Sequence, residues 1–147
     1  MYKHILVPTD GSPVSRSASF AAVKLASAVG ARITGLFAAP AATPLEYRGL
    51  LPVGIRTPHE NAAMIEKVAQ RYLKVIEKAA TAAGVRYQSI HITSDFPADA
   101  ILKVAKKHKC DLIYMASHGR RGIQGMLLGS VTQKVLARAD ISVLIHR

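Results

Sequence analysis

The sequence has few cysteines and aromatic residues and no long apolar run. Cys110 is the one cysteine among 147 residues, which excludes an intrachain disulfide and a four-thiolate zinc site. There is no tryptophan, and 3 phenylalanines and 5 tyrosines are the remaining aromatics. Modules that bind single-stranded nucleic acid interleave aromatics with basic residues, so this scarcity argues against that class. Apolar runs end well before the ~18 residues of a membrane span.

Acidic residues are also scarce. The chain has 9 Asp and Glu against 20 Lys and Arg, a formal net charge of +11. This excess favours anionic partners such as nucleotides, phosphate-rich metabolites or nucleic acid, although a merely basic surface gives the same count. The N-terminus reaches Pro8 and Asp10 too soon for a secretory signal. We therefore expect a cytoplasmic protein with no membrane partner.

Half of the sequence is hydrophobic, enough for the core of one domain over residues 1–147. Apolar patterns predict strands over 2–7, 33–37 (within 31–38), 86–93, 111–116 and 141–145. Helical spacing predicts helices over 13–29 and 58–83, a short one after Pro97, and a last one over 130–137. This alternation indicates an α/β fold with a parallel sheet and right-handed crossovers. The proline-rich residues 39–57 form a long connection, typical of a lid or contact surface.

Unusual residues follow two of the predicted strands. Pro8-Thr9-Asp10 follows the first strand and Ser117-His118-Gly119 follows the fourth. Ligands of such sheets bind outside the carboxyl ends of the strands. The second segment continues to Gly129-Ser130, where a helix begins, so free backbone N–H groups and the helix dipole suit a phosphate group. A surface loop in which Ser130 merely caps the helix is the alternative interpretation.

The glycine loop lacks the Gly-Lys-Ser/Thr ending of a Walker loop and the G-x-G-x-x-G of a dinucleotide fold. It resembles the loop G-x2-G-x9-G-S/T of the nucleotide-binding branch of the universal stress protein family. Gly119, nine residues and Gly129-Ser130 match the longer part, and Ala116 stands in place of the first glycine. The opening 5–12, Ile-Leu-Val-Pro-Thr-Asp-Gly-Ser, and the closing 142–145, Ser-Val-Leu-Ile, are also similar to the family. The resemblance implies an open parallel five-stranded sheet of order 3-2-1-4-5 with helices on both faces, a Rossmann-like adenine nucleotide-binding fold.

The same resemblance implies roles for individual residues. Asp10 corresponds to the acid that contacts the ribose, Pro8 and Thr9 to residues lining the purine, and Ala38 to the position whose backbone meets the adenine edge. The phosphate cradle corresponds to Gly119, Gly129, Ser130, Val131 and Thr132, and the predicted nucleotide site also includes Met115, Ala116, His118 and Arg120. Three departures accompany this match: Ala116, Asp95-Phe96-Pro97 in place of a Gly-x-Pro entry to the third helix, and Phe37 where histidine is frequent.

We therefore expect a stress-response sensor or regulator that binds ATP between the first and fourth strands, with Mg or Mn carried by the phosphates. No acid–base pair converges on a reacting centre in the pattern, which favours a binding protein over an enzyme. A slow ATP hydrolase, a nucleotide-free interaction protein and a nucleic-acid binder remain the alternatives. Asp10 also fits a helix-capping role, and His118 beside glycine is more typical of a solvated side chain than of a catalyst.

Two further expectations concern partners. The basic excess without aromatics predicts weak nucleic-acid binding with no sequence specificity. The strand over residues 141–145 would lie at the edge of the sheet without proline or inward charge, which favours a homodimer through that strand. The family resembled here commonly dimerises in this way. The six histidines show no i,i+4 pair on a helix, so we expect no dedicated metal site.

Overall fold

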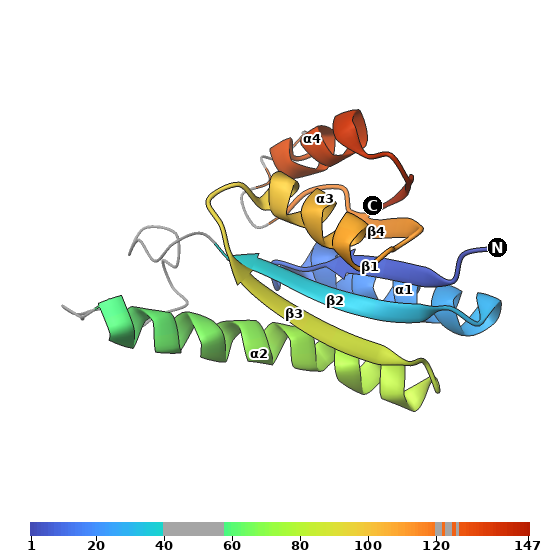
Figure 1. Cartoon of the computed structure of the whole chain (residues 1–147), viewed down its shortest axis with the longest axis horizontal. Coiled ribbons are helices and arrows are strands. Elements are labelled where there is room, and N and C mark those ends of the chain that lie inside the picture. The colour runs from blue at the N-terminus through green and yellow to red at the C-terminus, as the bar shows by residue number, and fades with distance from the viewer. Residues whose placement is uncertain (40–57, 120–121, 123–124, 126) are drawn as a thin grey trace.

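A computed structural model describes residues 1–39, 58–119, 122, 125 and 127–147 (Figure 1). Strands and helices alternate along the chain in the order β1 (His4–Pro8), α1 (Pro13–Val29), β2 (Arg32–Ala39), α2 (Pro58–Ala82), β3 (Tyr87–Thr93), α3 (Pro97–Lys107), β4 (Leu112–Ala116), α4 (Ser130–Arg138) and β5 (Ser142–His146). The strands form one parallel sheet in the order β3-β2-β1-β4-β5. The predicted fold class and strand order are confirmed.

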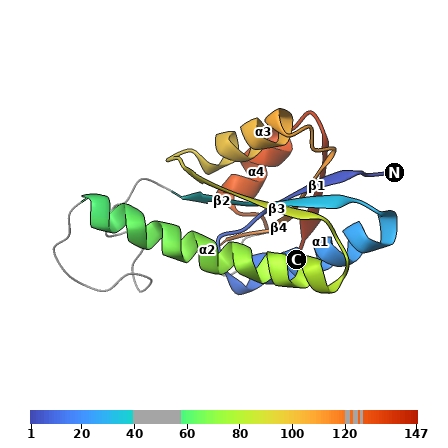
Figure 2. The same cartoon turned by 60° about the horizontal axis from the view of Figure 1, so that its bottom comes forward.

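The sheet separates two layers of helices. Figure 2 shows α1 and α2 on one face and α3 and α4 on the other. Alternate residues of β1 pack into different clusters: Ile5 and Val7 lie with α1, whereas Leu6 lies with α3 and α4. Because both faces of the central strands are covered, β1 and β4 are apolar along nearly their whole length rather than alternating with polar residues.

Helix α1 follows its sequence signals at both ends. The Ser12 Oγ accepts a hydrogen bond of 3.2 Å from the Ser15 N–H, and Pro13 occupies the first turn. Gly30 ends the helix at φ 71°, and its backbone N–H reaches the Ala26 carbonyl. These local signals explain why the predicted bounds 13–29 are confirmed.

Several strand bounds differ by one or two residues from the predicted ranges, and two strands end one residue later than predicted because they pair with a neighbouring strand there. Pro8 belongs to β1 because it pairs with Leu36 of β2. His146 belongs to β5 because its carbonyl accepts a hydrogen bond of 2.7 Å from the Ser117 N–H. The predicted connection over 39–57 lies, after Ala39, outside the described residues.

The two edge strands are less buried than the central ones. β3 has only half-buried and exposed positions, and β5 exposes Ser142 and Leu144. Across the described parts of the chain, no helix combines the length and the apolar character needed to cross a membrane.

Candidate functional site

The turn between β1 and α1 is built from hydrogen bonds among its own short polar side chains. The Ser12 N–H donates to the Asp10 Oδ1 at 2.9 Å, and the Gly11 N–H donates to the Thr9 Oγ1 at 3.2 Å. The Thr9 Oγ1 also lies 2.7 Å from the Ser15 Oγ, a buried hydroxyl of α1. Gly11 has a φ of 76°, which a residue with a side chain rarely adopts. This network fixes the direction of the Asp10 carboxylate.

The other oxygen of Asp10 lies against the loop that follows β4. A methyl group at position 119 would overlap the Asp10 Oδ2, so a larger residue there would force the carboxylate to shift. Asp10 and Gly119 are 109 positions apart and come from the two strands at which the strand order reverses. The structure thus brings together the two segments that the sequence singles out, at the point of the sheet where ligands of open α/β folds bind.

The N-terminus of α4 lies beside the same loop. Gly129 is the N-cap, and it offers no side chain to cap the helix. The Gly129 N–H donates to the Ser117 carbonyl at 2.7 Å, and a methyl group on Gly129 would lie 3.1 Å from the His118 Cα. Ser130 is exposed and Val131 half-buried. The first turn of a helix has N–H groups without helical partners and a positive dipole end, so it can hold an anion.

Three predicted site residues have side chains that bond or pack inside the protein. Thr132 is 2% exposed, and its hydroxyl donates to the Ala116 carbonyl at 3.0 Å. The Ala116 methyl packs in the cluster with α1, and the Met115 side chain packs in the cluster with α3 and α4. The methyl that replaces the family's glycine therefore contributes to the core. At all three positions the backbone is left as the part that can meet a ligand.

The other residues of the predicted nucleotide site lie at different places around the carboxyl ends of the strands or outside the described residues. The His118 Nδ1 lies 3.0 Å from the Ser117 Oγ. Pro8 and Ala38 are half-buried near the carboxyl ends of adjacent strands, β1 and β2. Arg120 lies outside the described residues. Within the described ranges, no three His, Cys, Asp or Glu side chains form a group able to hold a metal ion.

Tyr72 packs against the turn between β1 and α1, a contact that sequence reasoning missed. Its ring lies so close to Gly11 that a methyl group there would overlap it. The ring also meets Phe37 edge-on, with centroids 5.5 Å apart. In the sequence, Tyr72 is only one of the apolar positions of the α2 pattern. The one signal of the contact is Gly11, because a residue without a side chain leaves room for a packed ring. Tyr72 packs α2 and β2 against the turn that carries Asp10.

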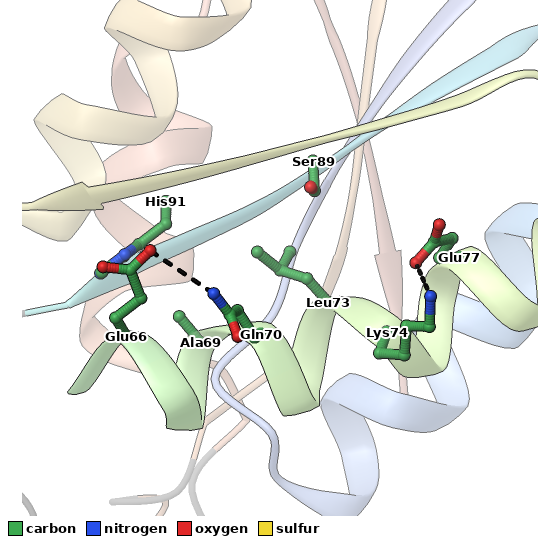
Figure 3. A pocket seen from close by; sticks show the side chains of 8 residues that line it. All are labelled: Glu66, Ala69, Gln70, Leu73, Lys74, Glu77, Ser89 and His91. Carbon is green, nitrogen blue, oxygen red and sulfur yellow. Dashed lines mark hydrogen bonds and ion pairs between the residues drawn. The ribbon is translucent and has the colours of Figure 1, made fainter. Parts of the chain in front are cut away.

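A polar groove of about 450 Å³ runs between α2 and β3, and Figure 3 shows the side chains that line it. Glu66 of α2 lies beside His91 of β3, and Lys74 pairs with Glu77 at 2.8 Å (Figure 3). Burial lowers the pKa of His91, while the Glu66 carboxylate acts in the opposite direction. None of the predicted nucleotide-site residues lines this groove, so it is a separate feature of the α2 side.

The single cysteine packs in the core as a small apolar side chain. Cys110 is 5% exposed and belongs to the cluster with α3 and α4. Burial raises the pKa of its thiol to about 11, so the thiolate form is negligible near neutral pH. A nucleophilic role for Cys110 has no support in this environment.

Fold and site together define a Rossmann-like α/β protein whose β1 turn meets a glycine-containing loop after β4. The profile of the Universal stress protein family matches residues 1–147. The chain therefore belongs to the universal stress protein family.

Individual relatives agree with this assignment. The universal stress protein MJ0531 of Methanocaldococcus jannaschii is 31% identical over 145 residues, which span 99% of this chain and 82% of that protein. The solved structure of the protein MJ0577 has a TM-score of 0.79 at 25% identity, covering 99% of this chain and 96% of that one. A universal stress protein solved in complex with cAMP has a TM-score of 0.68 at 28% identity, covering 98% and 95%.

Proposed function

We propose that the protein binds ATP between the carboxyl ends of β1 and β4 and acts as a stress-response regulator rather than as an enzyme. The observation that carries the proposal is the contact between the Asp10 carboxylate and Gly119 at the reversal of strand order. The family membership and the relative solved with cAMP support an adenine nucleotide as the ligand class.

Each part of the nucleotide has a proposed partner. The Asp10 carboxylate accepts hydrogen bonds from the ribose hydroxyls, and its own bond from Ser12 holds it in place. Pro8 and Thr9 line the purine, and the backbone of Ala38 meets the adenine edge. The phosphates lie at the first turn of α4, where Gly129 provides no side chain to block them and Ser130 adds a hydroxyl. A Mg or Mn ion bound through the phosphates would add to their neutralisation.

The net charge of +11 favours an anionic ligand such as ATP even without specific contacts. A positively charged protein attracts ATP over long range and raises its local concentration. Salt screens this attraction, since the Debye length is about 8 Å at physiological ionic strength. We expect the affinity for ATP to fall as salt rises, and more steeply than the affinity for adenosine.

Calorimetry on the purified protein with ATP and Mg or Mn tests the proposal. Asp10→Ala removes one charge-assisted contact and should cost roughly 1.5–3 kcal/mol, a ten- to hundredfold loss of affinity. Asp99→Ala is the matched control, because Asp99 is an exposed acid of α3 that pairs with Arg138 away from β1. Absence of ATP binding by the unmodified protein at millimolar concentration would contradict the proposal.

Mass spectrometry of the small molecules released on denaturation gives an independent result. An adenine nucleotide recovered in stoichiometric amount supports the proposal and identifies ATP, ADP, AMP or a cyclic nucleotide directly. Recovery of a non-adenine ligand that competes with ATP would contradict it.

A further inference from the structure

Basic side chains gather at the amino ends of the strands, the edge of the sheet opposite the proposed nucleotide site. Figure 1 shows the starts of β1, β2 and β3 and the turn between α3 and β4 at one end of the molecule, on the right. Five exposed cations occupy this end on the α3 side, and we call them the amino-edge patch: Arg32, Arg86, Lys106, Lys107 and Lys109.

The register of the sheet places the two arginines together. Ile33 pairs with Tyr87, so Arg32 and Arg86 stand opposite each other at the starts of β2 and β3, and the Ile33 N–H donates to the Arg86 carbonyl at 2.8 Å. Adjacent strands lie about 4.8 Å apart. Both arginines have the parity of Leu36 and Ile90, which pack toward α3, so both side chains lie on the α3 face.

The C-terminal end of α3 brings the three lysines to the same place. The Gln88 Nε2 donates to the Thr34 Oγ1 at 2.8 Å and lies 3.5 Å from the His108 Nδ1, which joins the starts of β2 and β3 to the end of α3. Lys106 and Lys107 form the last turn of α3, and Lys109 follows in the turn to β4. The amino-edge patch is therefore one surface built from three elements.

Local structural needs do not account for this charge. The negative end of the α3 dipole favours Lys106 and Lys107 but does not act on the arginines of β2 and β3. Lys109 has a φ of 53°, a conformation that favours glycine, yet the position carries a cation. Asp111 is the acid nearest to the patch in sequence, and its carboxylate accepts the backbone N–H groups of Lys3 and His4 at 2.8 and 3.0 Å.

We propose that the amino-edge patch binds the phosphate backbone of double-stranded nucleic acid without reading its sequence. The side chains interspersed with the cations on this face, Thr34, Gln88 and His108, are polar and suit phosphate contacts. A surface that binds membranes would place apolar anchors among its cations, and one that binds single strands would present aromatic platforms. A duplex carries one negative charge per about 1.7 Å of its axis, so several cations within one surface contact several phosphates at once.

This inference goes beyond nucleotide binding and does not depend on it. The proposed ATP site lies at the carboxyl ends of β1 and β4, and the amino-edge patch lies at the other ends of the strands. Asp10→Ala is therefore expected to leave duplex binding unchanged.

Fluorescence anisotropy with a labelled duplex of about 24 base pairs, at 50 and 200 mM salt, tests the proposal. The patch variant is Lys106→Gln/Lys107→Gln/Lys109→Gly, and the matched control is Lys67→Gln/Arg71→Gln/Lys78→Gln on the exposed face of α2. Both remove three positive charges. We expect the patch variant to bind at least about tenfold more weakly at 50 mM salt, with the slope of log K against log salt reduced by about two to three. The control should stay within about threefold of the unmodified protein.

Lys109→Gly alone separates loss of binding from loss of folding. Glycine relieves the positive φ at this position, so the melting temperature should equal or exceed that of the unmodified protein while duplex affinity falls. Equal weakening by the patch and control triple variants would overturn the proposal. So would tighter binding to a single strand of the same length, or binding to phosphatidylserine vesicles with none to the duplex at 50 mM salt.

Discussion

Asp10 and Gly119 show how a single missing side chain joins two distant segments. The Asp10 Oδ2 occupies the space that a methyl group on Gly119 would need. The Ser12 N–H holds the other oxygen of the same carboxylate, so a shift of the Oδ2 would act against that hydrogen bond. The position therefore couples the β4 loop to the β1 turn, and a small substitution there should disturb the site more than the fold.

We predict that Gly119→Ala weakens ATP binding by at least about tenfold while changing the melting temperature little, because position 119 is exposed and its neighbour is a side chain. Gly30→Ala is the matched control. Gly30 has a φ of 71° and open space around it, so alanine there should cost about 1 kcal/mol of stability and leave ATP affinity unchanged. Calorimetry and thermal denaturation measure the two effects, and ATP binding equal to wild type in Gly119→Ala would refute the coupling.

His4 is a buried histidine whose titration links stability to pH. It is 3% exposed, and its Nε2 lies 2.7 Å from the Thr34 Oγ1. Burial lowers the pKa of His4 and the Arg32 guanidinium lowers it further, whereas the backbone of His108 and the Asp111 carboxylate act in the opposite direction. The unfolded chain therefore binds a proton more readily than the folded one. The neutral His4 contributes its full share to the free energy of unfolding at pH values above about 6.5, the pKa of histidine in the unfolded chain. This contribution is lost as the pH falls below that value.

We predict that the free energy of unfolding falls between pH 7 and pH 5, with a slope from His4 of at most about 1.4 kcal/mol per pH unit. His4→Gln keeps a hydrogen-bonding group next to Thr34 but does not titrate, so its pH dependence should be shallower. His91→Gln should act in the same direction, because burial also lowers the pKa of His91. Urea denaturation across this pH range measures the slopes, and identical slopes in His4→Gln and wild type would rule out the assignment.

At the scale of elements, α4 is held to β4 by one buried hydrogen bond near its start. The Thr132 hydroxyl donates to the Ala116 carbonyl at 3.0 Å, and this bond fixes where the N-terminal turn of α4 lies relative to the end of the central strand. The Gly129 N–H bonds the Ser117 carbonyl just beside it. Anion binding at a helix terminus depends on such placement, because the N–H groups act only over the first turn.

We predict that Thr132→Val destabilises the protein by about 1–3 kcal/mol, since the buried Ala116 carbonyl loses its donor. ATP affinity should fall as well, because the first turn of α4 is released. Thr132→Ser keeps the hydroxyl and should retain most of both properties. Urea denaturation and calorimetry make the comparison, and a Thr132→Val protein that binds ATP as well as Thr132→Ser would show that this bond does not position the site.

The elements themselves follow from local sequence, whereas the contacts that build the site do not. Pro13 and Gly30 mark the ends of α1, and the alternation of strands and helices gives the parallel sheet. The family resemblance adds the strand order and the site residues. The packing of Tyr72 on Gly11 depends on the rotation of α2 about its axis. The use of the Thr132 hydroxyl by Ala116 depends on how α4 meets β4. Such contacts join residues far apart in the chain, and no local pattern contains them.

At the scale of the whole molecule, the two ends of the strands carry different chemistry. The carboxyl ends hold the Asp10 turn and the N-terminus of α4, and the amino ends hold the amino-edge patch. The two sides of the sheet also differ, because β3 borders the groove beside α2 while β5 exposes part of its length. The proposed nucleotide site, the proposed duplex surface and the β5 edge are thus separate regions of one fold, and each can be changed without touching the others.

The hydrogen bonds between β5 and β4 show which residues of β5 direct their backbone groups to the open edge of the sheet, where a second copy could pair. The His146 carbonyl accepts from the Ser117 N–H, so residues 142, 144 and 146 direct their backbone groups toward β4. Residues 143 and 145 therefore direct theirs to the open side of the sheet. Leu144 is 36% exposed, and Val143 and Ile145 are half-buried. A row of unpaired backbone groups on a partly apolar strand favours pairing with a second copy about a two-fold axis.

We predict a homodimer in which the β5 strands of two copies pair, and Val143→Pro should convert it to a monomer. Proline at 143 removes an outward N–H and leaves the bonds to β4 intact. The matched control is Ser89→Pro on the opposite edge. Residue 89 also points outward, because the Ser94 N–H bonds the Ala39 carbonyl and the inward positions of β3 are therefore even-numbered. Sedimentation velocity at tens of micromolar, with and without ATP, distinguishes the outcomes. A folded Val143→Pro protein that remains dimeric would move the interface away from β5, and a monomeric wild type would exclude the dimer.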